Sequence, residues 1–278
     1  MKTANILAIV LFLSTTLVTA KTPLVILHTN DTHSQLEPYP ADDSRNPDGA
    51  GIVRREALYS QVRSEEPNVL VFDAGDLVQG TPYFNFFKGE AEVRLTNYLK
   101  PDAVTLGNHE FDNGIDSLSK MLRKAEFSIV STNYDVSRTS LKEIVKPWLV
   151  IKKGGLRIGV VGANINPEGL VTQANYKGMV WLEPISTVEA RAAWLKCKKK
   201  CDIVICLSHL GLDNGDTAPD DLTLADESKS IDVIIGGHTH TFLKKPIIRK
   251  NKNGNNVIIN QVGKGGIFVG RLDLMVGE

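Results

Sequence analysis

The decapeptide from Thr105 to Gly114 carries more reactive side chains than a connecting loop needs. It reads Thr-Leu-Gly-Asn-His-Glu-Phe-Asp-Asn-Gly, so two amides, an imidazole and two carboxylates lie between two glycines. An apolar run at 103–106 precedes it and a helix-like segment at 115–124 follows, which predicts a loop between a strand and a helix. Open α/β folds bind their ligands at such loops. Taken alone, the decapeptide is also compatible with a polar Asn/Asp/Gly turn that holds an incidental histidine.

Four further loops that follow apolar runs carry matching groups. Their side chains are Asp31, His33, Asp76, His209, His238 and His240. Five of the six histidines of the chain therefore fall in loops of this kind. His28, at the end of the first apolar run, is the exception, and we expect it to be a core or strand-end residue. Because the histidines fall so regularly in these loops, we predict that the loops share one site.

The residue types at this site indicate a metal centre. Imidazoles and carboxylates without thiolates suit Zn²⁺, Mn²⁺, Fe or Mg²⁺. Alternate residues of an extended segment point to the same side, so Asp31 with His33, and His238 with His240, can each reach one centre. The candidate ligands are Asp31, His33, Asp76, Asn108, His209, His238 and His240. Seven ligands are too many for one tetrahedral ion and fit two ions about 3.5–4 Å apart, for which Asp76 is the expected bridge.

The elements that must position these loops follow from the hydrophobic runs. Buried strands are expected at 24–27, 69–72, 103–106, 203–207 and 233–235. Helices are expected at 52–64, from Pro82 to about Leu99, at 115–124 and at 185–200. A Gly-Gly pair at 154–155 predicts a hairpin between the extended runs 148–152 and 156–161. The runs 257–262 and 267–276 are expected to form a closing pair of strands.

Composition restricts the class of protein. The 278 residues are 42% hydrophobic and 23% charged, which is typical of a globular chain with a sizeable core. Lys+Arg and Asp+Glu are both 32, so no net charge favours nucleic acid or an anionic membrane. An anionic substrate must therefore be held by local groups or by metal. We expect Cys197, Cys201 and Cys206 to be structural. Cys197 and Cys201 form no C-x-x-C pair and have no ligand histidine near them in the sequence, so a metal site built from these thiols is not expected. A disulfide between positions four apart on one helix would have poor geometry.

The first twenty residues differ from the rest of the chain. Lys2, the apolar stretch 6–13 and the small-residue pattern 18–20 are typical of a secretory signal peptide. We expect residues 1–20 to be removed, no stable membrane insertion, and a mature protein in the periplasm or outside the cell. No internal repeat or linker is visible, so residues 21–278 are predicted to form one domain.

In chain order, these motifs resemble the signature of the calcineurin-like metallophosphoesterases, and the longer strings around them resemble the 5′-nucleotidase branch. The motifs are Asp31-Thr32-His33, Gly75-Asp76, Gly107-Asn108-His109-Glu110, His209 and Gly237-His238-Thr239-His240. The resemblance extends from residue 24 to about residue 276. It implies an α/β fold, a four-layer α/β/β/α sandwich. It also implies two divalent metal ions, Zn²⁺, Mn²⁺ or similar.

The resemblance also implies a role for each site residue. One ion would be held by Asp31, His33, Asp76 and His240, and the other by Asp76, Asn108, His209 and His238. His109 and Asp112 would form a catalytic dyad, and Asn108 and His109 would contact the substrate. The residues themselves agree with this division, since the adjacent Asn108 and His109 cannot easily point at the same ion. Glu110 is expected to brace its loop.

The implied activity is hydrolysis of a nucleotide, most simply a nucleoside 5′-monophosphate or a related phosphomonoester, by metal-activated hydroxide. A 2′,3′-cyclic nucleotide phosphodiesterase and a nucleotide-sugar pyrophosphatase are alternatives, and a non-catalytic metal-binding module is a third. The resembling enzymes carry a C-terminal nucleoside-binding domain that is absent from these 278 residues. A separate chain that supplies this domain is one expected partner. Alternatively, the enzyme has broad specificity, or the chain is a fragment.

Overall fold

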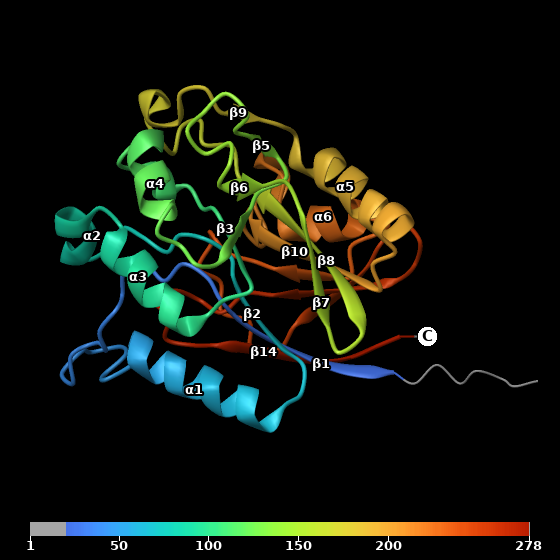
Figure 1. Ribbon diagram of the computed structural model, residues 1–278, viewed down its shortest axis with the longest axis horizontal. Helices are drawn as coiled ribbons and strands as arrows, with labels where there is room; N and C mark the ends of the chain where they lie inside the picture. Colours follow the sequence, from blue (N-terminus) through green and yellow to red (C-terminus); the bar gives the residue numbers. More distant parts are fainter. Residues whose placement is uncertain (1–20, 278) are drawn as a thin grey trace, which may run out of the picture.

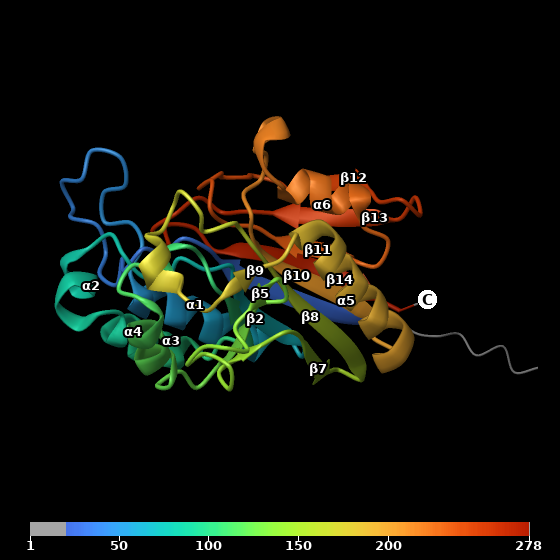
Figure 2. The same cartoon turned by 90° about the horizontal axis from the view of Figure 1, so that it is seen from above.

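The computed structural model describes residues 21–277, and the predicted signal peptide lies outside this range. Two six-stranded sheets lie face to face (Figures 1 and 2). The first sheet contains, in spatial order, β14 (Gly270–Val276), β1 (Thr22–Thr29), β2 (Val69–Asp73), β3 (Ala103–Thr105), β4 (Ser128–Val130) and β6 (Val145–Lys146). Its strands are parallel except β14, which pairs antiparallel with β1.

The second sheet also has a parallel centre, but both of its edge strands are antiparallel. It contains, in spatial order, β12 (Ile247–Lys250), β13 (Asn256–Asn260), β11 (Val233–Ile235), β10 (Ile203–His209), β8 (Leu156–Asn164) and β7 (Leu149–Lys153). The edge strands β12 and β7 are the antiparallel ones. All carboxyl ends of the parallel strands within one sheet therefore point to one edge.

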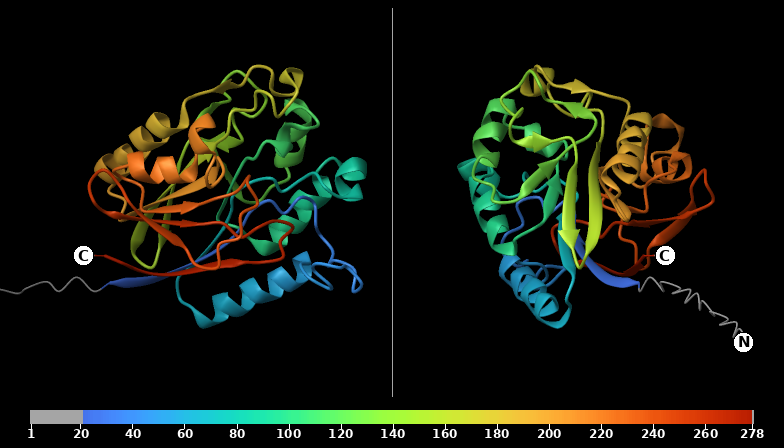
Figure 3. Two further views of the ribbon diagram at one scale, coloured as in Figure 1. Left: turned by 180° about the vertical axis from the view of Figure 1, so that it is seen from behind. Right: turned by 45° about the vertical axis from the view of Figure 1, so that its right-hand side comes forward.

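Both faces of each sheet are covered, which explains the continuous apolar runs in the sequence. In β1, Leu24 and Ile26 join a core cluster that the two sheets share, whereas Val25 and Leu27 face the helices. The helices on the first sheet are α1 (Ile52–Glu65), α2 (Pro82–Phe87), α3 (Glu90–Leu99) and α4 (Ile115–Leu122). The helices α5 (Pro184–Lys199) and α6 (Asp221–Glu227) cover the second sheet on the opposite side (Figure 3). The predicted α/β fold class is confirmed.

Two predictions of secondary structure were wrong. The helix expected from Pro82 to Leu99 is two helices, because Lys88 (φ 54°) and Gly89 (φ 88°) are left-handed. A side chain at Gly89 would overlap the sulfur of Met121, so the chain turns where only glycine fits against α4. The second error concerns the closing strands, which do not pair with each other: β13 lies parallel to β11, whereas β14 joins β1 in the other sheet.

Several smaller features complete the fold. The predicted hairpin is present, with Gly154 and Gly155 both at positive φ between β7 and β8. Short elements that the sequence did not indicate are the paired strands β5 (Tyr134–Asp135) and β9 (Val180–Trp181) and the 3₁₀ turns η1 (His109–Phe111), η2 (Gln173–Tyr176) and η3 (Gly215–Thr217). The three cysteines are free thiols. Within residues 21–277, no helix has the length and apolarity needed to cross a bilayer.

Candidate dimetal active site

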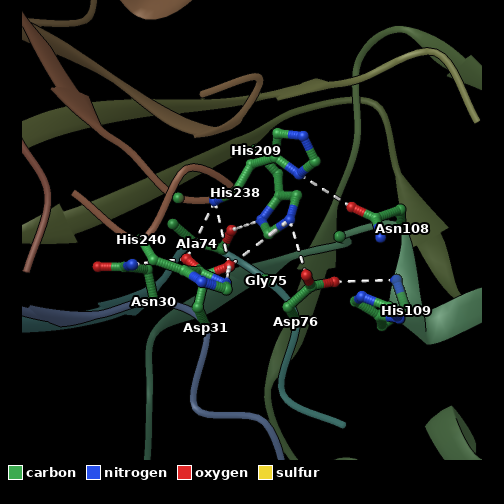
Figure 4. Close-up of polar contacts among 12 residues, drawn as sticks. Asn30, Asp31, Ala74, Gly75, Asp76, Asn108, His109, His209, His238 and His240 are labelled. Atoms are coloured by element: carbon green, nitrogen blue, oxygen red, sulfur yellow. Dashed lines mark hydrogen bonds and ion pairs between the residues drawn. The ribbon is translucent and has the colours of Figure 1, made fainter. Parts of the chain in front are cut away.

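The loops after β1, β2, β3, β10 and β11 meet at one edge of the sandwich (Figure 4). Three of these strands belong to the first sheet and two to the second, so the two sheets present their carboxyl ends to each other. A connected series of short contacts, described below, joins all nine residues that the sequence nominated. These are Asp31, His33, Asp76, Asn108, His109, Asp112, His209, His238 and His240, and the two contacts that link the two halves of the series are 3.9 Å long.

Five of the candidate ligands have a left-handed backbone, which residues other than glycine seldom adopt. The φ angles are 50° for Asp31, 49° for His33, 54° for Asp76, 73° for His238 and 54° for His240. Such conformations persist where the surrounding structure holds them, and they gather at functional sites. The prediction that Asp31 with His33, and His238 with His240, project from extended segments was therefore wrong: these residues reach the site from a left-handed backbone.

Two glycines allow the second and third loops to touch. A Cβ atom on Gly75, which has φ 91°, would lie 2.6 Å from the backbone nitrogen of Gly107, and a Cβ atom on Gly107 would overlap the carboxylate of Asp76. Larger residues at either position would push the loops apart. The glycines in the two motifs thus bring Asp76 next to the loop that carries Asn108 and His109.

A first group of donors consists of Asp31, His33 and His240. The Nε2 atoms of the two histidines are 3.0 Å apart, and Asp31 Oδ1 lies 3.3 Å from His240 Nε2 and 3.8 Å from His33 Nε2. The Nδ1 atom of His33 donates to the carbonyl oxygen of Gln79 at 3.0 Å. Since a carbonyl can only accept, a neutral His33 directs the lone pair of Nε2 at the other donors. Burial lowers the pKa of His33 and favours this neutral form.

A second group consists of Asp31, Asp76 and His209. His209 is fully buried, and its Nδ1 donates to the carbonyl oxygen of Ala74 at 2.7 Å. Its Nε2 faces Asp76 Oδ2 at 3.1 Å and Asp31 Oδ1 at 3.9 Å and has no hydrogen-bond partner. Burial by itself lowers the pKa of His209, but the carboxylates of Asp76 and Asp31 outweigh it and raise the pKa to about 10.

These contacts test whether the residues fit a cation. A neutral His209 would direct the lone pair of Nε2 at a carboxylate, which is repulsive, so the arrangement requires positive charge at this point. A proton on His209 or a metal cation between the groups would supply that charge. The surrounding donors are imidazoles, carboxylates and an amide, all of which ligate Zn²⁺ or Mn²⁺. The donor set fits divalent metal.

The remaining two donors lie in contact with each other. Asn108 Oδ1 is 3.0 Å from Nδ1 of His238, and the backbone N–H of His238 donates to both carboxylate oxygens of Asp31, at 3.0 and 3.1 Å. Burial and the neighbouring His209 lower the pKa of His238 to about 4, so its ring is neutral. The structure thus brings Asn108 and His238 together beside the second group of donors (Figure 4).

Asp31 belongs to both groups of donors, and Asp76 of the second group also reaches His33 of the first. Its Oδ2 is 3.1 Å from His209 Nε2 and 3.9 Å from His33 Nε2, while its Oδ1 accepts the backbone N–H of His109 at 2.9 Å. Burial alone would raise the pKa of Asp76, but His209, His109 and His33 outweigh burial and hold the pKa well below its usual value. The carboxylate is therefore ionised and has histidines of both groups within reach, as a bridging ligand requires.

His109 and Asp112 form a separate pair at the mouth of the site. Asp112 Oδ2 lies 2.8 Å from Nδ1 of His109, and this hydrogen bond raises the pKa of His109. Asn175 on η2 donates to the backbone oxygen of Asp112 at 2.8 Å and holds the pair from a distant part of the chain. The His109 ring is 5.4 Å from the His33 ring, centroid to centroid. With Nδ1 engaged, Nε2 is the atom of His109 that can donate to a substrate.

Glu110 braces the loops, as expected. Its buried carboxylate accepts backbone N–H groups of Asp76 at 3.1 Å, Leu77 at 2.8 Å and Gly107. Burial and the nearby Asp76 carboxylate raise the pKa of Glu110 to about 7. One side chain thus ties the loop that holds Asp76 to the loop that holds Asn108.

Two buried amides were missed by sequence reasoning. Asn30 donates to Asp31 Oδ2 at 2.6 Å and to Gly263 O at 2.7 Å, so it joins the first loop to the chain after β13. Gln261 donates to Gly237 O at 2.6 Å and supports the loop between His238 and His240. Asn30 lies inside a motif that the sequence singled out, but nothing in the sequence distinguishes Gln261 from an ordinary strand-end residue.

A pocket of about 260 Å³ opens over the site. Its lining includes His33, His109 and His240, together with Tyr39, Gln79 and Lys264. Two of the candidate donors, His33 and His240, therefore form part of a concave surface that a small molecule can enter.

Comparison with known proteins identifies the family. The family model described as calcineurin-like phosphoesterase matches residues 24–242. The chain belongs to this family. It is 31% identical to human 5′-nucleotidase in an alignment of 276 positions that covers 92% of this chain and 47% of the human protein. It is also 31% identical to a trifunctional nucleotide phosphoesterase of Bacillus subtilis, covering 92% of this chain and 18% of that protein.

Solved structures agree with this membership. The structure of a 5′-nucleotidase precursor from Thermus thermophilus superimposes with a TM-score of 0.80 at 33% identity, covering 92% of this chain and 53% of that one. The chain thus spans about half the length of the 5′-nucleotidases it matches. The calcineurin-like phosphoesterase fold expected from the motifs is confirmed.

Proposed function

We propose that this protein is an exported, dimetal phosphoester hydrolase that acts on nucleoside 5′-monophosphates or related phosphomonoesters. The observation that carries the proposal is the meeting of two groups of donors, which share Asp31 and which Asp76 also joins through His209 at 3.1 Å and His33 at 3.9 Å. The buried Nε2 of His209 faces carboxylates and has no hydrogen-bond partner within the described residues. Family membership and the similarity to 5′-nucleotidases support the same activity. Localisation in the periplasm or outside the cell rests on the predicted signal peptide alone.

The donors divide into two ligand sets. We assign Asp31, His33, Asp76 and His240 to one ion, and Asp76, Asn108, His209 and His238 to the other, with Asp76 shared. Two divalent ions at these positions would neutralise the phosphoryl oxygens and supply an activated water. The carbonyl oxygens of Gln79 and Ala74 fix the tautomers of His33 and His209, so both rings present Nε2 to the site.

His109 supplies a proton donor on the open side of the site. Its hydrogen bond to Asp112 raises its pKa and holds Nδ1, so the protonated ring donates from Nε2. This N–H can stabilise a phosphoryl oxygen and give its proton to the departing alkoxide. A positioned acid of this kind contributes typically about 10²–10⁴-fold to the rate.

Cyclic nucleotides and nucleotide-sugar pyrophosphates are the second candidate class of substrate. The Bacillus subtilis relative, of which this chain covers 18%, is named as a trifunctional nucleotide phosphoesterase, which supports testing more than one nucleotide phosphoester as substrate. The phosphoryl chemistry is the same in each case, and the leaving group differs.

The test is a substrate panel with the full chain. The protein is stripped with chelator, reconstituted with Mn²⁺ or Zn²⁺, and assayed with AMP, 2′,3′-cyclic AMP and UDP-glucose. We expect fastest hydrolysis of AMP, no turnover without metal, and recovery on metal addition. Failure to release phosphate from AMP with any divalent metal would refute the proposed function, and faster cleavage of the cyclic nucleotide or the pyrophosphate would replace the substrate class.

A further inference from the structure

A second concavity lies beside the candidate active site and is not used by the proposed chemistry. It has a volume of about 360 Å³ and is lined by the segment after β1 and by the start of α2. Figure 2 shows these two segments at the same end of the molecule. Gln35 and Thr81 line both this groove and the pocket over the histidines, so the two spaces adjoin at these residues. A molecule held by its phosphate over the candidate metal ligands can therefore extend into the groove.

The walls of the groove are tied to the site. One wall continues directly from His33, and Thr81 of the other wall donates its hydroxyl to the backbone oxygen of Ser34 at 2.9 Å. Gly80 packs so closely that a Cβ atom there would lie 2.8 Å from the backbone oxygen of His33. The groove is thus held in a constant position relative to a predicted metal ligand.

The side chains of the groove suit a flat aromatic ring with polar edges. The rings of Tyr83 and Phe87 are stacked, with centroids 6.2 Å apart and planes inclined by 28°. Phe87 is 54% exposed and Phe86 is 79% exposed, so apolar ring surface is available to a ligand. The Tyr83 hydroxyl donates to Glu37 Oε1 at 2.8 Å, which joins the two walls and leaves carboxylate lone pairs for ring-edge donors.

We propose that this groove binds the base of a nucleotide whose phosphate lies at the candidate metal site. The proposal rests on the proposed function for the identity of the phosphate site. Aromatic side chains bind bases by stacking, irrespective of sequence, because every base has a π-face. The contiguous pocket and groove would hold phosphate, sugar and base in that order, so base recognition would lie within this chain.

The rival occupant is protein. Exposed aromatic clusters also mark contact surfaces for other chains, and Phe86 is exposed enough for such a role. The contiguity with the histidine-lined pocket favours the nucleotide, because a contact surface for protein has no need of a passage to the site. The two occupants predict different results for a small substrate.

The experiment compares AMP with ribose 5-phosphate, which lacks the base. The variants are Tyr83→Ala and Phe87→Ala, with Tyr83→Phe as a variant that keeps the ring. Tyr98→Ala is the matched control, since Tyr98 is a 71% exposed aromatic residue outside the groove. From base–aromatic stacking we expect the two alanine variants to raise KM for AMP about tenfold. We expect kcat for AMP, and both constants for ribose 5-phosphate, to stay within about twofold.

A second readout is independent of catalysis. Calorimetric titration of the full chain with adenosine should detect binding that Tyr83→Ala weakens about tenfold and that Tyr83→Phe and Tyr98→Ala retain. Circular dichroism and melting temperature establish that each variant is folded.

Three results would overturn the proposal. The first is an unchanged KM for AMP in both alanine variants, and the second is an equal loss of activity on AMP and on ribose 5-phosphate. The third is an unchanged ratio of the activities on the two substrates together with a changed sedimentation coefficient, which would assign the groove to protein. A wild-type chain that hydrolyses neither substrate would refute the proposed function instead. In that case adenosine binding still decides the groove.

Discussion

Replacing Glu110 should test whether this residue holds the loops of the site together. In Glu110→Ala the buried backbone N–H groups of Asp76, Leu77 and Gly107 lose their common acceptor. An unsatisfied buried donor costs about 1–3 kcal/mol, so three donors with partial relaxation predict a loss of about 3–5 kcal/mol in the free energy of unfolding. Glu110→Gln keeps one acceptor oxygen with two lone pairs, and its loss should be about 1–2 kcal/mol.

The same substitution should weaken metal binding. Because Glu110 holds the loops of Asp76 and Asn108 together, its removal resembles the loss of an outer-shell partner, which costs about 10–100-fold in metal affinity. Urea denaturation of the metal-free protein measures stability, and competition with a chromophoric chelator measures Zn²⁺ affinity. Glu143→Ala, at a glutamate whose side chain is 82% exposed, is the control and should change neither quantity. If Glu110→Ala unfolded within about 1 kcal/mol of the wild type and bound Zn²⁺ equally well, the bracing role would be wrong.

Three further predictions concern the site and its surroundings. His109→Ala should lower kcat for AMP by about 10²–10⁴-fold while metal content, measured by atomic absorption, stays unchanged; near-wild-type turnover would exclude the acid role. Asp112→Asn should lower the pKa of His109, visible in a pH–rate profile as a basic limb that moves to lower pH, and an unmoved limb would contradict the pairing. His28 is fully buried, and burial lowers its pKa to about 3. Below pH 6.5, His28 is therefore protonated in the unfolded chain but stays neutral in the folded chain until the pH approaches 3. Stability is therefore lost as the pH falls from 6.5, by about 2 kcal/mol at pH 5. Denaturant titrations at pH 8 and pH 5 measure the decrease in the free energy of unfolding between these pH values. This decrease should be about 2 kcal/mol smaller for His28→Gln than for the wild type, and equal decreases would contradict the lowered pKa of His28.

The distribution of histidines was informative because of how parallel strands end. Apolar runs such as 24–27 and 203–207 indicated strands buried on both faces, and the polar groups after them had to lie at a carboxyl edge. His28 stood apart from the other histidines for the same reason, and the structure buries it between Asn260 and Gly270. The hydrophobic pattern and the position of each histidine relative to it were sufficient for these predictions, since both are local properties of the sequence.

The errors and omissions have a common cause. The break between α2 and α3 occurs at the left-handed Lys88 and Gly89, where the chain packs against Met121 of another helix, and the separation of β13 from β14 arises from membership of different sheets. Gln261 supports a candidate metal-binding loop only because β13 ends next to β11. None of these contacts is encoded in the residues near the feature it controls.

Residue types and their spacing were enough to predict which side chains could serve one centre, that imidazole and carboxylate donors suit metal, and that Asp76 was the candidate bridge. These conclusions depend on residue type and on the alternation of strands and loops, which short-range physical chemistry specifies. Only the tertiary structure decided that the loops of two different sheets face each other, that Ala74 and Gln79 set the tautomers of His209 and His33, and that an aromatic groove adjoins the site. Those features depend on contacts between residues far apart in the chain, and they exist only after the two sheets have packed.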